Sequence, residues 1–425
     1  MKRTAITVLL LICILFCNSC GKNQNKPDVP GPIEIKNTIA PTYTPTPFPE
    51  ILPVEQNVSA TAYSTFPMVN GEDEPIWDFA PASPIEKAVT DQSDTTAYYR
   101  FLWSKNRYFL RITVMDASEE GSEFPELADH ISVYVNENGR KPSKYGNGDM
   151  SLLVGRFGNI NYGPGCNPNE IHATAYEIAS GYVVELSLPF VTVRGEEGLC
   201  FGFDVKVCDY DKGKLVKTLC LEDIGGKTES TLKDIGSLTC SEQTALPNFQ
   251  PMDFNNELWD SAMVVPLKNT AYGTKGAEAS FRMLHDETNL YIRVNVKDET
   301  LDTDSPLMTR KDGVELFVNF DSEKPLKYRA GCDMHFRIGR DGELSCESGA
   351  DENSIRYEVR SDESGYSVCA CIRIPEAMLS TTEIGFDLHV NDSFGTQMRD
   401  YIVVWSDISL LTYSNLSKVG TVYLK

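Results

Sequence analysis

The sequence predicts an all-β protein with two tandem antiparallel β-sandwich domains of jelly-roll-like topology. Three observations support this fold class: apolar and polar residues alternate along short segments, turn signals separate the segments, and one series of motifs occurs twice. No segment carries an apolar stripe at helical spacing over three turns. Short strands with frequent turns, in units of about 180 residues, favour β-sandwiches.

The N-terminal segment 1–20 has the features of a secretory signal peptide. Lys2 and Arg3 precede an apolar run at 5–16, which is shorter than the ~20 residues that span a membrane. A small residue, Ser19, then precedes Cys20, as at a bacterial lipoprotein cleavage site. We therefore favour a lipoprotein in which Cys20 carries the lipid; secretion with cleavage nearby is the alternative.

Residues 21–56 are predicted to form a disordered Pro/Thr-rich linker. The segment holds eight prolines, with Thr, Asn and Lys between them. Such a composition cannot bury enough apolar surface to pack a core, so an extended tether is expected.

The repeated motifs define the two folded domains. Phe109-Leu-Arg-Ile-Thr-Val114 alternates with period two and returns as Tyr291-Ile-Arg-Val-Asn-Val296. Trp77 and Trp259 also occur at matching positions, so both are expected in the core rather than in a ligand site. The offset between matching motifs stays at 182 to 184 residues, which is the length of a whole domain. The predicted domains are 57–240 and 246–425.

Composition excludes several functions. The formal net charge of −22 repels nucleic acid and acidic membrane surfaces, so no nucleic-acid partner is expected. Nine cysteines follow Cys20, an odd number, without a Cys-x-x-Cys spacing and without matching positions in the two repeats. Zinc-ribbon and thioredoxin-like sites are therefore not predicted.

The order and spacing of the motifs resemble the family 9 carbohydrate-binding modules that accompany xylanases. The motifs that carry the resemblance are Asp312-Gly-Val-Glu-Leu-Phe-Val318, Gly365-Tyr366, Ile384-Gly-Phe-Asp-Leu388 and Trp405-Ser-Asp407. The second domain is closer to the family than the first. The resemblance implies a β-sandwich that clamps a sugar between aromatic rings and binds its hydroxyl groups with polar side chains.

Three residues of the second domain match binding positions of that family. The resemblance implies that Glu315 accepts hydrogen bonds from sugar hydroxyls, that Arg337 donates to sugar oxygens, and that Tyr413 replaces one of two stacking tryptophans. The other stacking position falls near Thr309, where no aromatic residue occurs. The alternative is that Glu315 and Arg337 are ordinary solvated side chains on the outer faces of their strands and bind no ligand.

The first domain lacks all three matching residues. Ser132 stands in place of the glutamate, Leu153 in place of the arginine, and Glu229 in place of the tyrosine. Two hypotheses follow: this domain preserves the fold as a spacer, or it binds another ligand.

An acidic loop follows the strand that ends near residue 297. Asp298, Asp302 and Asp304 supply hard oxygen ligands of the kind that bind calcium, and the resemblance implies structural calcium in this family. A plain acidic turn is the alternative. No cofactor is required for the predicted function.

The predicted function is non-catalytic carbohydrate binding at the bacterial cell surface. The protein would capture plant-type polysaccharide or oligosaccharide, such as xylan or glucan chains, for degradation or uptake. Its partners would be the sugar, a lipid anchor at the outer face of the cytoplasmic membrane, and glycosidases or a sugar transporter. The alternatives are a structural or adhesion lipoprotein without a sugar site, a glycoside hydrolase accessory protein, an enzyme with a carboxylate pair, and a solute receptor; the last would need strand–helix alternation.

Overall fold

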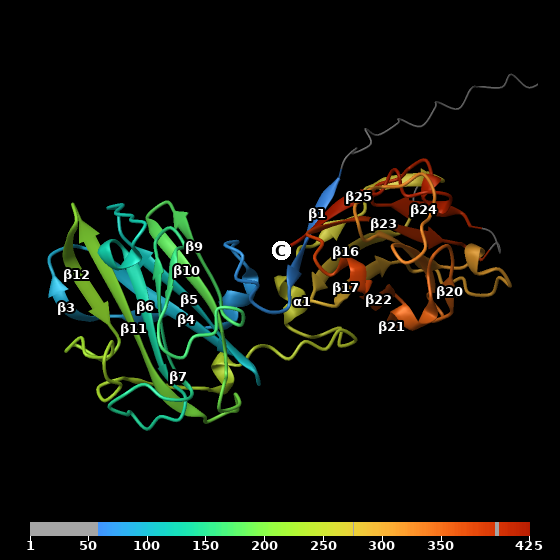
Figure 1. Ribbon diagram of the computed structural model, residues 1–425. Coiled ribbons are helices and arrows are strands. Elements are labelled where there is room, and N and C mark those ends of the chain that lie inside the picture. The colour runs from blue at the N-terminus through green and yellow to red at the C-terminus, as the bar shows by residue number, and fades with distance from the viewer. Residues whose placement is uncertain (1–57, 275, 396–398) are drawn as a thin grey trace, which may run out of the picture. The chain divides into compact units, whose positions relative to one another are not determined.

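The computed structural model describes residues 58–274, 276–395 and 399–425 (Figure 1). The predicted signal peptide, the predicted lipidation site Cys20 and the predicted linker lie outside the described residues. Within these ranges no helix combines the length and the apolar character needed to cross a membrane. The regular structure of the described chain is mostly strand, 45% against 7% helix, which confirms the predicted fold class.

The first domain is a sandwich of two sheets. One sheet has five strands in the order β2 (Ser83–Ile85), β4 (Thr96–Trp103), β5 (Arg107–Met115), β10 (Gly181–Pro189) and β9 (His172–Ile178). The other has the order β3 (Lys87–Asp91), β12 (Lys214–Cys220), β11 (Cys200–Asp211), β6 (His130–Asn136), β7 (Asp149–Gly155) and β8 (Ile160–Tyr162), with β13 (Ser237–Thr239) beside β11.

The second domain repeats this arrangement, but one strand joins its two faces into a continuous sheet. The strand order is β20 (Leu344–Cys346), β19 (Asp333–Gly339), β18 (Gly313–Asn319), β23 (Glu383–Asp392), β25 (Gly420–Leu424), β1 (Ser59–Ser64), β16 (Glu278–His285), β17 (Asn289–Lys297), β22 (Gly365–Arg373) and β21 (Ile355–Asp362). β14 (Val265–Pro266) pairs with β16, and β24 (Tyr401–Val404) pairs with both β23 and β15 (Asn269–Tyr272).

Short helices connect the strands. They are α1 (Leu258–Ser261), η1 (Pro75–Phe79), η2 (Pro125–Leu127), η3 (Glu242–Thr244), η4 (Met308–Arg310), η5 (Glu352–Ser354), η6 (Glu376–Met378) and η7 (Leu411–Tyr413). Trp77 lies in η1 and Trp259 in α1, and both side chains are buried, as expected for core residues.

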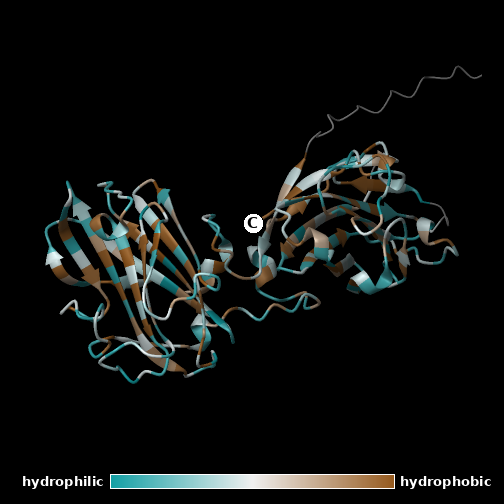
Figure 2. Ribbon diagram, in the orientation of Figure 1, coloured by the Kyte–Doolittle hydropathy of each residue, from teal (hydrophilic) through white to brown (hydrophobic). Residues whose placement is uncertain are grey.

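Each sandwich has its own apolar core, because alternate residues of every strand point inward. Figure 2 shows hydrophobic and hydrophilic residues alternating along the strands. In the second domain Trp405 packs edge-on against Phe281, with ring centroids 5.2 Å apart. The outer faces carry most of the polar side chains, together with smaller apolar clusters such as the one around Trp77 and Trp259.

Strand β1 belongs to the sheet of the second domain, although it precedes the first domain in the sequence. It runs parallel to β25 on one side and to β16 on the other (Figure 1). Ala60 and Ala62 point into the core of the second domain. The predicted boundary at residue 57 grouped this segment with the first domain, whereas its hydrogen-bonded neighbours are strands of the second. The two parallel pairings also depart from the expected antiparallel order, because β1 enters from a distant part of the chain rather than through a hairpin.

The segment before the second domain makes a matching contact with the first domain. Ala245 forms an isolated parallel bridge with Trp103, and the Leu246 amide donates to the Trp103 carbonyl at 2.8 Å. In the second domain the Thr65 amide donates to the His285 carbonyl at 2.9 Å, at the matching position. Thus β1, which precedes the first repeat, pairs with strands of the second repeat. Ala245, which precedes the second repeat, pairs with a strand of the first.

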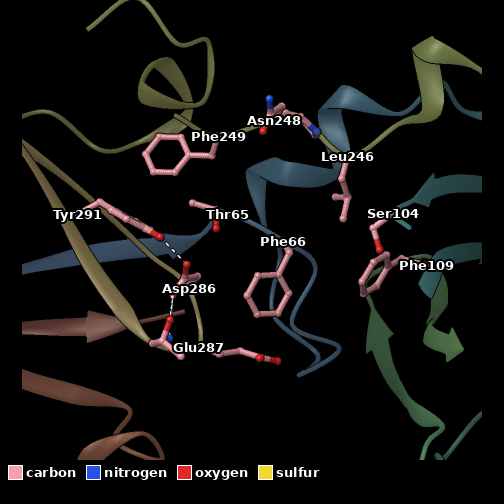
Figure 3. Close-up of a pocket in the computed structure, with 12 residues that line it drawn as sticks. Thr65, Phe66, Ser104, Phe109, Leu246, Asn248, Phe249, Asp286, Glu287 and Tyr291 are labelled. Atoms are coloured by element: carbon pink, nitrogen blue, oxygen red, sulfur yellow. Dashed lines mark hydrogen bonds between the residues drawn. The ribbon is translucent and has the colours of Figure 1, made fainter. Parts of the chain in front are cut away.

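A carboxylate fixes the hairpin between β16 and β17. Asp286 accepts hydrogen bonds from the amides of Thr288 and Asn289, both at 2.7 Å. It also accepts from the hydroxyl of Tyr291, as Figure 3 shows. Burial raises the pKa of Asp286, but these donors outweigh it and hold the pKa below its usual range. The hairpin sets the register with which β17 crosses the sheet.

Candidate functional site

Glu315 lies at the centre of the outer face of the sheet β19–β18–β23. It alternates along β18 with Val314 and Leu316, which belong to the core. The antiparallel register places Arg337 of β19 directly beside it on one side and His389 of β23 on the other. A polar cluster therefore forms on three adjacent strands.

Four side chains donate hydrogen bonds to the Glu315 carboxylate. Arg337 Nη2 and His335 Nε2 approach Oε2 at 2.9 and 2.8 Å, while Asn391 Nδ2 and the Tyr413 hydroxyl approach Oε1 at 2.7 and 3.0 Å. An ionised carboxylate offers about four acceptor positions, so this one is fully used. The three residues predicted from the sequence are thus brought together.

The charge of Glu315 is fixed by its surroundings. The side chain is 0% exposed, and burial by itself raises its pKa. The hydrogen bond from His335 and the charge of Arg337 outweigh burial and hold the pKa of Glu315 well below its usual range. The carboxylate therefore stays ionised throughout the neutral and mildly acidic range.

Tyr413 reaches the cluster from η7. Leu410, just before η7, has a left-handed backbone with φ of 58°, and the Tyr328 hydroxyl donates to the Thr412 carbonyl at 2.6 Å. These features hold the loop against the sheet. Arg399 Nη1 donates to the Tyr413 hydroxyl at 2.7 Å, and the same guanidinium lies 5.7 Å from the centre of the tyrosine ring. Burial, followed by the charge of Glu315, raises the pKa of Tyr413 well above its usual range.

The geometry changes the role expected for Glu315. A carboxylate that is enclosed and already accepts four hydrogen bonds organises its neighbours rather than offering an open acceptor to a sugar. Three polar atoms around it are instead buried without a hydrogen-bond partner among the described residues: Arg337 Nε, His389 Nδ1 and Asn391 Oδ1. Such atoms are costly unless a ligand or water satisfies them.

Sequence reasoning missed His335, His389, Asn391 and Arg399. The first three could have been found, because period-two alternation places His335 on the face of Arg337, and His389 and Asn391 on one face of β23. Arg399 lies in a loop, where alternation gives no signal; its Nε donates to the Thr309 carbonyl at 2.9 Å.

The matching face of the first domain carries different residues in the same register. Ser132 faces Leu153 across β6 and β7, as Glu315 faces Arg337 across β18 and β19. With these smaller and apolar side chains the face forms a groove of about 440 Å³. Lys206, at the position of His389, lies 5.3 Å from the centre of the Tyr134 ring.

The predicted calcium ligands do not form a single group in the structure. Asp298 is buried, Asp302 accepts from the Ser393 hydroxyl at 3.0 Å, and Asp304 is exposed. Asp298 groups instead with Asp312 and Asp392, and one carboxylate oxygen of each lies within 4.8 Å of the others.

An arginine already occupies this acidic group. Arg340 Nη1 lies 3.0 Å from Asp298 and 3.7 Å from Asp312. Burial raises the pKa of Asp312 to about 7 and that of Asp392 to about 6. The first domain repeats the group with Asp116, Asp129, Asp209 and Arg156. Because both domains keep it, the cluster is explained by the fold, and calcium binding stays a prediction.

The fold and the polar face together define a β-sandwich binding module. The chain belongs to the family described as carbohydrate family 9 binding domain-like, whose model matches it twice, at residues 69–237 and 254–425. This confirms the resemblance and the tandem arrangement.

Curated relatives share this tandem region. Endo-1,4-beta-xylanase C of Paenibacillus barcinonensis is 25% identical over 94% of this chain and 37% of its own length. Exoglucanase XynX of Acetivibrio thermocellus is 25% identical over 86% of this chain and 33% of its own length. The chain therefore spans about a third of the curated relatives that it matches.

A solved structure is similar at the level of one domain. A family 9 carbohydrate-binding module from Caldicellulosiruptor kristjanssonii in complex with cellotriose has 21% sequence identity and a TM-score of 0.38, and the match covers 40% of this chain and 85% of that one.

Proposed function

We propose that the second domain binds the neutral sugar units of a plant-type polysaccharide or oligosaccharide, without catalysis, on the face organised by Glu315. The observation that carries this proposal is the group of buried polar atoms without partners beside a fixed ionic network. Sugar hydroxyl groups both donate and accept, so they can satisfy Arg337 Nε, His389 Nδ1 and Asn391 Oδ1 together.

The ring of Tyr413 supplies the apolar part of such a site. Sugar rings present C–H faces that pack on aromatic faces. With Thr309 at the other stacking position, the chain offers one aromatic platform there, so we expect weaker binding than from a two-sided clamp. Xylan and glucan chains are the ligands that we favour, since the curated relatives are xylanases and an exoglucanase.

We further propose that the protein acts at the outer face of the bacterial cytoplasmic membrane, anchored through Cys20. The support is the sequence pattern of residues 1–20 followed by a proline-rich segment. There it would hold polysaccharide near partner glycosidases or a sugar transporter. Both family matches are binding modules, which supports a role without chemistry of its own.

Titration calorimetry with xylo-, cello- and gluco-oligosaccharides tests the proposal. The chain from residue 21 onwards should be used, because it lacks the lipid anchor and retains β1. We expect saturable heat that is lost in Tyr413→Ala, with Glu229→Ala at the matching position of the first domain as the control. The proposed site would be rejected if the folded protein released no binding heat with any oligosaccharide. It would also be rejected if both variants lost binding equally.

A further inference from the structure

A cavity lies on the outer face of the second domain that is opposite to the Glu315 face. It has a volume of about 370 Å³ and is lined by residues of β17, β22 and β21, together with the segment before α1. We propose that this cavity is a separate ligand site that binds the carboxylate group of an acidic sugar, such as a uronic acid. That the ligand is a sugar rests on the proposed function; that it carries a carboxylate rests on the residues of this cavity.

Arg293 is the centre of this site. It alternates with the core residues Ile292 and Val294 on β17, so its side chain points to the outer face. Its Nε is buried without a hydrogen-bond partner, and no ion pair of this guanidinium occurs within the described residues. Arg293 as a whole is partly exposed, but its buried Nε has no partner in that part of the chain, which favours an anionic ligand that can accept from this guanidinium.

The matching arginine of the first domain is paired internally. Arg111 Nη1 lies 2.8 Å from Asp73, and Arg111 Nε lies 3.8 Å from the buried carboxylate of Glu185. Glu74, also buried, adds a third carboxylate nearby, and burial raises its pKa to about 7. The first domain therefore needs no external anion at this position.

All three carboxylates are absent from the second domain. Register places Cys369 beside Arg293, where Glu185 stands beside Arg111. At the constant offset of 182 residues, Asp73 corresponds to Asn255, and the next residue, Glu74, likewise corresponds to an asparagine. The same scaffold thus presents its arginine without the carboxylates that neutralise it.

A second arginine enters the face in the same register. Arg360 of β21 pairs with Ser367, as Tyr176 of β9 pairs with Val183 in the first domain. Its guanidinium lies 4.3 Å from the centre of the Phe254 ring, which orients it over the cavity. Its nearest carboxylate is the exposed Glu358 at 3.4 Å, a surface pair that contributes little.

The rest of the lining holds mostly neutral polar side chains, with one lysine, one carboxylate and the apolar Phe254 and Val296. Asn295 and Ser367 are hydrogen bonded to each other at 2.9 Å and replace Thr113 and Val183 of the first domain. The carboxylate, Asp362, is occupied by the amide and hydroxyl of Ser364 at its own turn. In a protein with a net charge of −22, this is a local concentration of positive charge.

These features match a carboxylate-bearing sugar. A guanidinium fork binds a carboxylate through two parallel hydrogen bonds, and amide and hydroxyl side chains suit ring hydroxyl groups. Strands β17 and β21 are two strand spacings apart, about 10 Å. A sugar unit fits between them, and the side chains of Arg293 and Arg360 can reach it from either side.

The test compares trigalacturonic acid with its methyl ester by calorimetry on the chain from residue 21 onwards. The ester keeps the sugar rings and their hydroxyl groups but replaces each carboxylate with a neutral, slightly larger methyl ester. We expect the acid to bind at least about tenfold more tightly than the ester, the loss expected when a charge-assisted hydrogen bond is removed. Equal affinity would overturn the proposal, and so would equal competition by sulfate, which would show attraction of any anion.

Two variants assign the site. Arg293→Gln should weaken acid binding by about tenfold or more. Cys369→Glu combined with Asn255→Asp restores the two carboxylates that lie nearest Arg111 in the first domain, and should abolish acid binding while leaving the protein folded. Retained acid binding in Arg293→Gln would overturn the proposal.

The Tyr413→Ala variant separates this site from the one around Glu315. Acid binding that persists when neutral-sugar binding is lost supports two independent sites. Acid binding that disappears with Tyr413→Ala would place the acidic sugar on the Glu315 face and reject the second site. Acid binding without any neutral-sugar binding in the unmodified chain would reject the proposed function and uphold this inference.

Discussion

The two domains share one scaffold and differ on two outer faces. Both keep a buried tryptophan before the first long strand, and both keep an arginine among three buried aspartates. On the face of Glu315, however, the first domain has Ser132, and on the opposite sheet it has Glu185 where the second domain has Cys369. A few substitutions at matching strand positions thus decide which polar and charged groups each copy places on these two faces.

The comparison also separates charge that stabilises the fold from charge available for binding. The paired Arg111 and the unpaired Arg293 occupy the same strand position. Carboxylates of its own domain balance the charge of Arg111, whereas no such carboxylate among the described residues pairs with Arg293, so this position marks a functional difference between the two copies. The following changes test the comparison, from the largest expected effect to the smallest.

Replacing Glu315 with the residue of the first domain should have the largest effect. Glu315→Ser removes the carboxylate that pairs with the buried Arg337. We expect the free energy of unfolding of the second domain to fall by about 3–5 kcal/mol and sugar binding to disappear. Calorimetric unfolding and sugar titration measure the two effects. The matched control, Ser132→Ala, should change stability by less than about 1 kcal/mol; an equal loss in both variants would contradict the comparison.

Overpacking β1 tests whether this strand belongs to the second domain. Ala62 is fully buried between β25 and β16. We expect Ala62→Leu to reduce the stability of the second domain by about 1–3 kcal/mol. Limited proteolysis followed by mass spectrometry should show faster cleavage within 278–424 than within 83–239. Faster cleavage confined to the first domain would show that β1 does not pack as described.

Restoring the missing aromatic residue should strengthen sugar binding. Thr309 lies beside Arg399, which contacts Tyr413. We expect Thr309→Trp to improve affinity by about 0.5–1.5 kcal/mol through a second stacking surface. Titration with the best oligosaccharide checks this, and Thr309→Val serves as the control without a ring. An unchanged affinity would mean that the sugar does not pass between positions 309 and 413.

Acid should leave sugar binding almost unchanged until Glu315 is protonated. The pKa of Glu315 is depressed in the folded state, so its stabilising contribution is fully present above its unfolded pKa of about 4.3 and is lost as pH falls through the folded pKa. We expect constant affinity between about pH 5 and pH 8. Because His335 and His389 share the site, the carboxyl signal of Glu315 itself should be followed by carbon-13 NMR; a midpoint of that signal near pH 6 would contradict its assigned ionisation state.

Much of the fold could be predicted from the sequence because strand alternation and turn signals are local. Trp77, Trp259 and the repeated strand motifs have their expected places. The position of β1 could not be predicted, because pairing between segments more than two hundred residues apart leaves no periodic signal. The pairing of β1 with the second repeat, and of Ala245 with the first, depends on tertiary packing alone.

The candidate site could be predicted in part. Glu315, Arg337 and Tyr413 were identified through the family resemblance, and the structure brings them into one hydrogen-bonded cluster. Their enclosure could not be foreseen, since burial of Glu315 depends on Asn391 and His335 from neighbouring strands. The unpaired state of Arg293 became visible only when register aligned it with Arg111.

The most direct test of the central claim is a crystal structure of the chain from residue 21 onwards with a bound cello- or xylo-oligosaccharide. The account predicts sugar density on the outer face of β19–β18–β23, against Tyr413 and within hydrogen-bond distance of Arg337. It predicts no sugar density on the matching face of the first domain, around Ser132 and Leu153. Sugar bound only at that first-domain face would contradict the account.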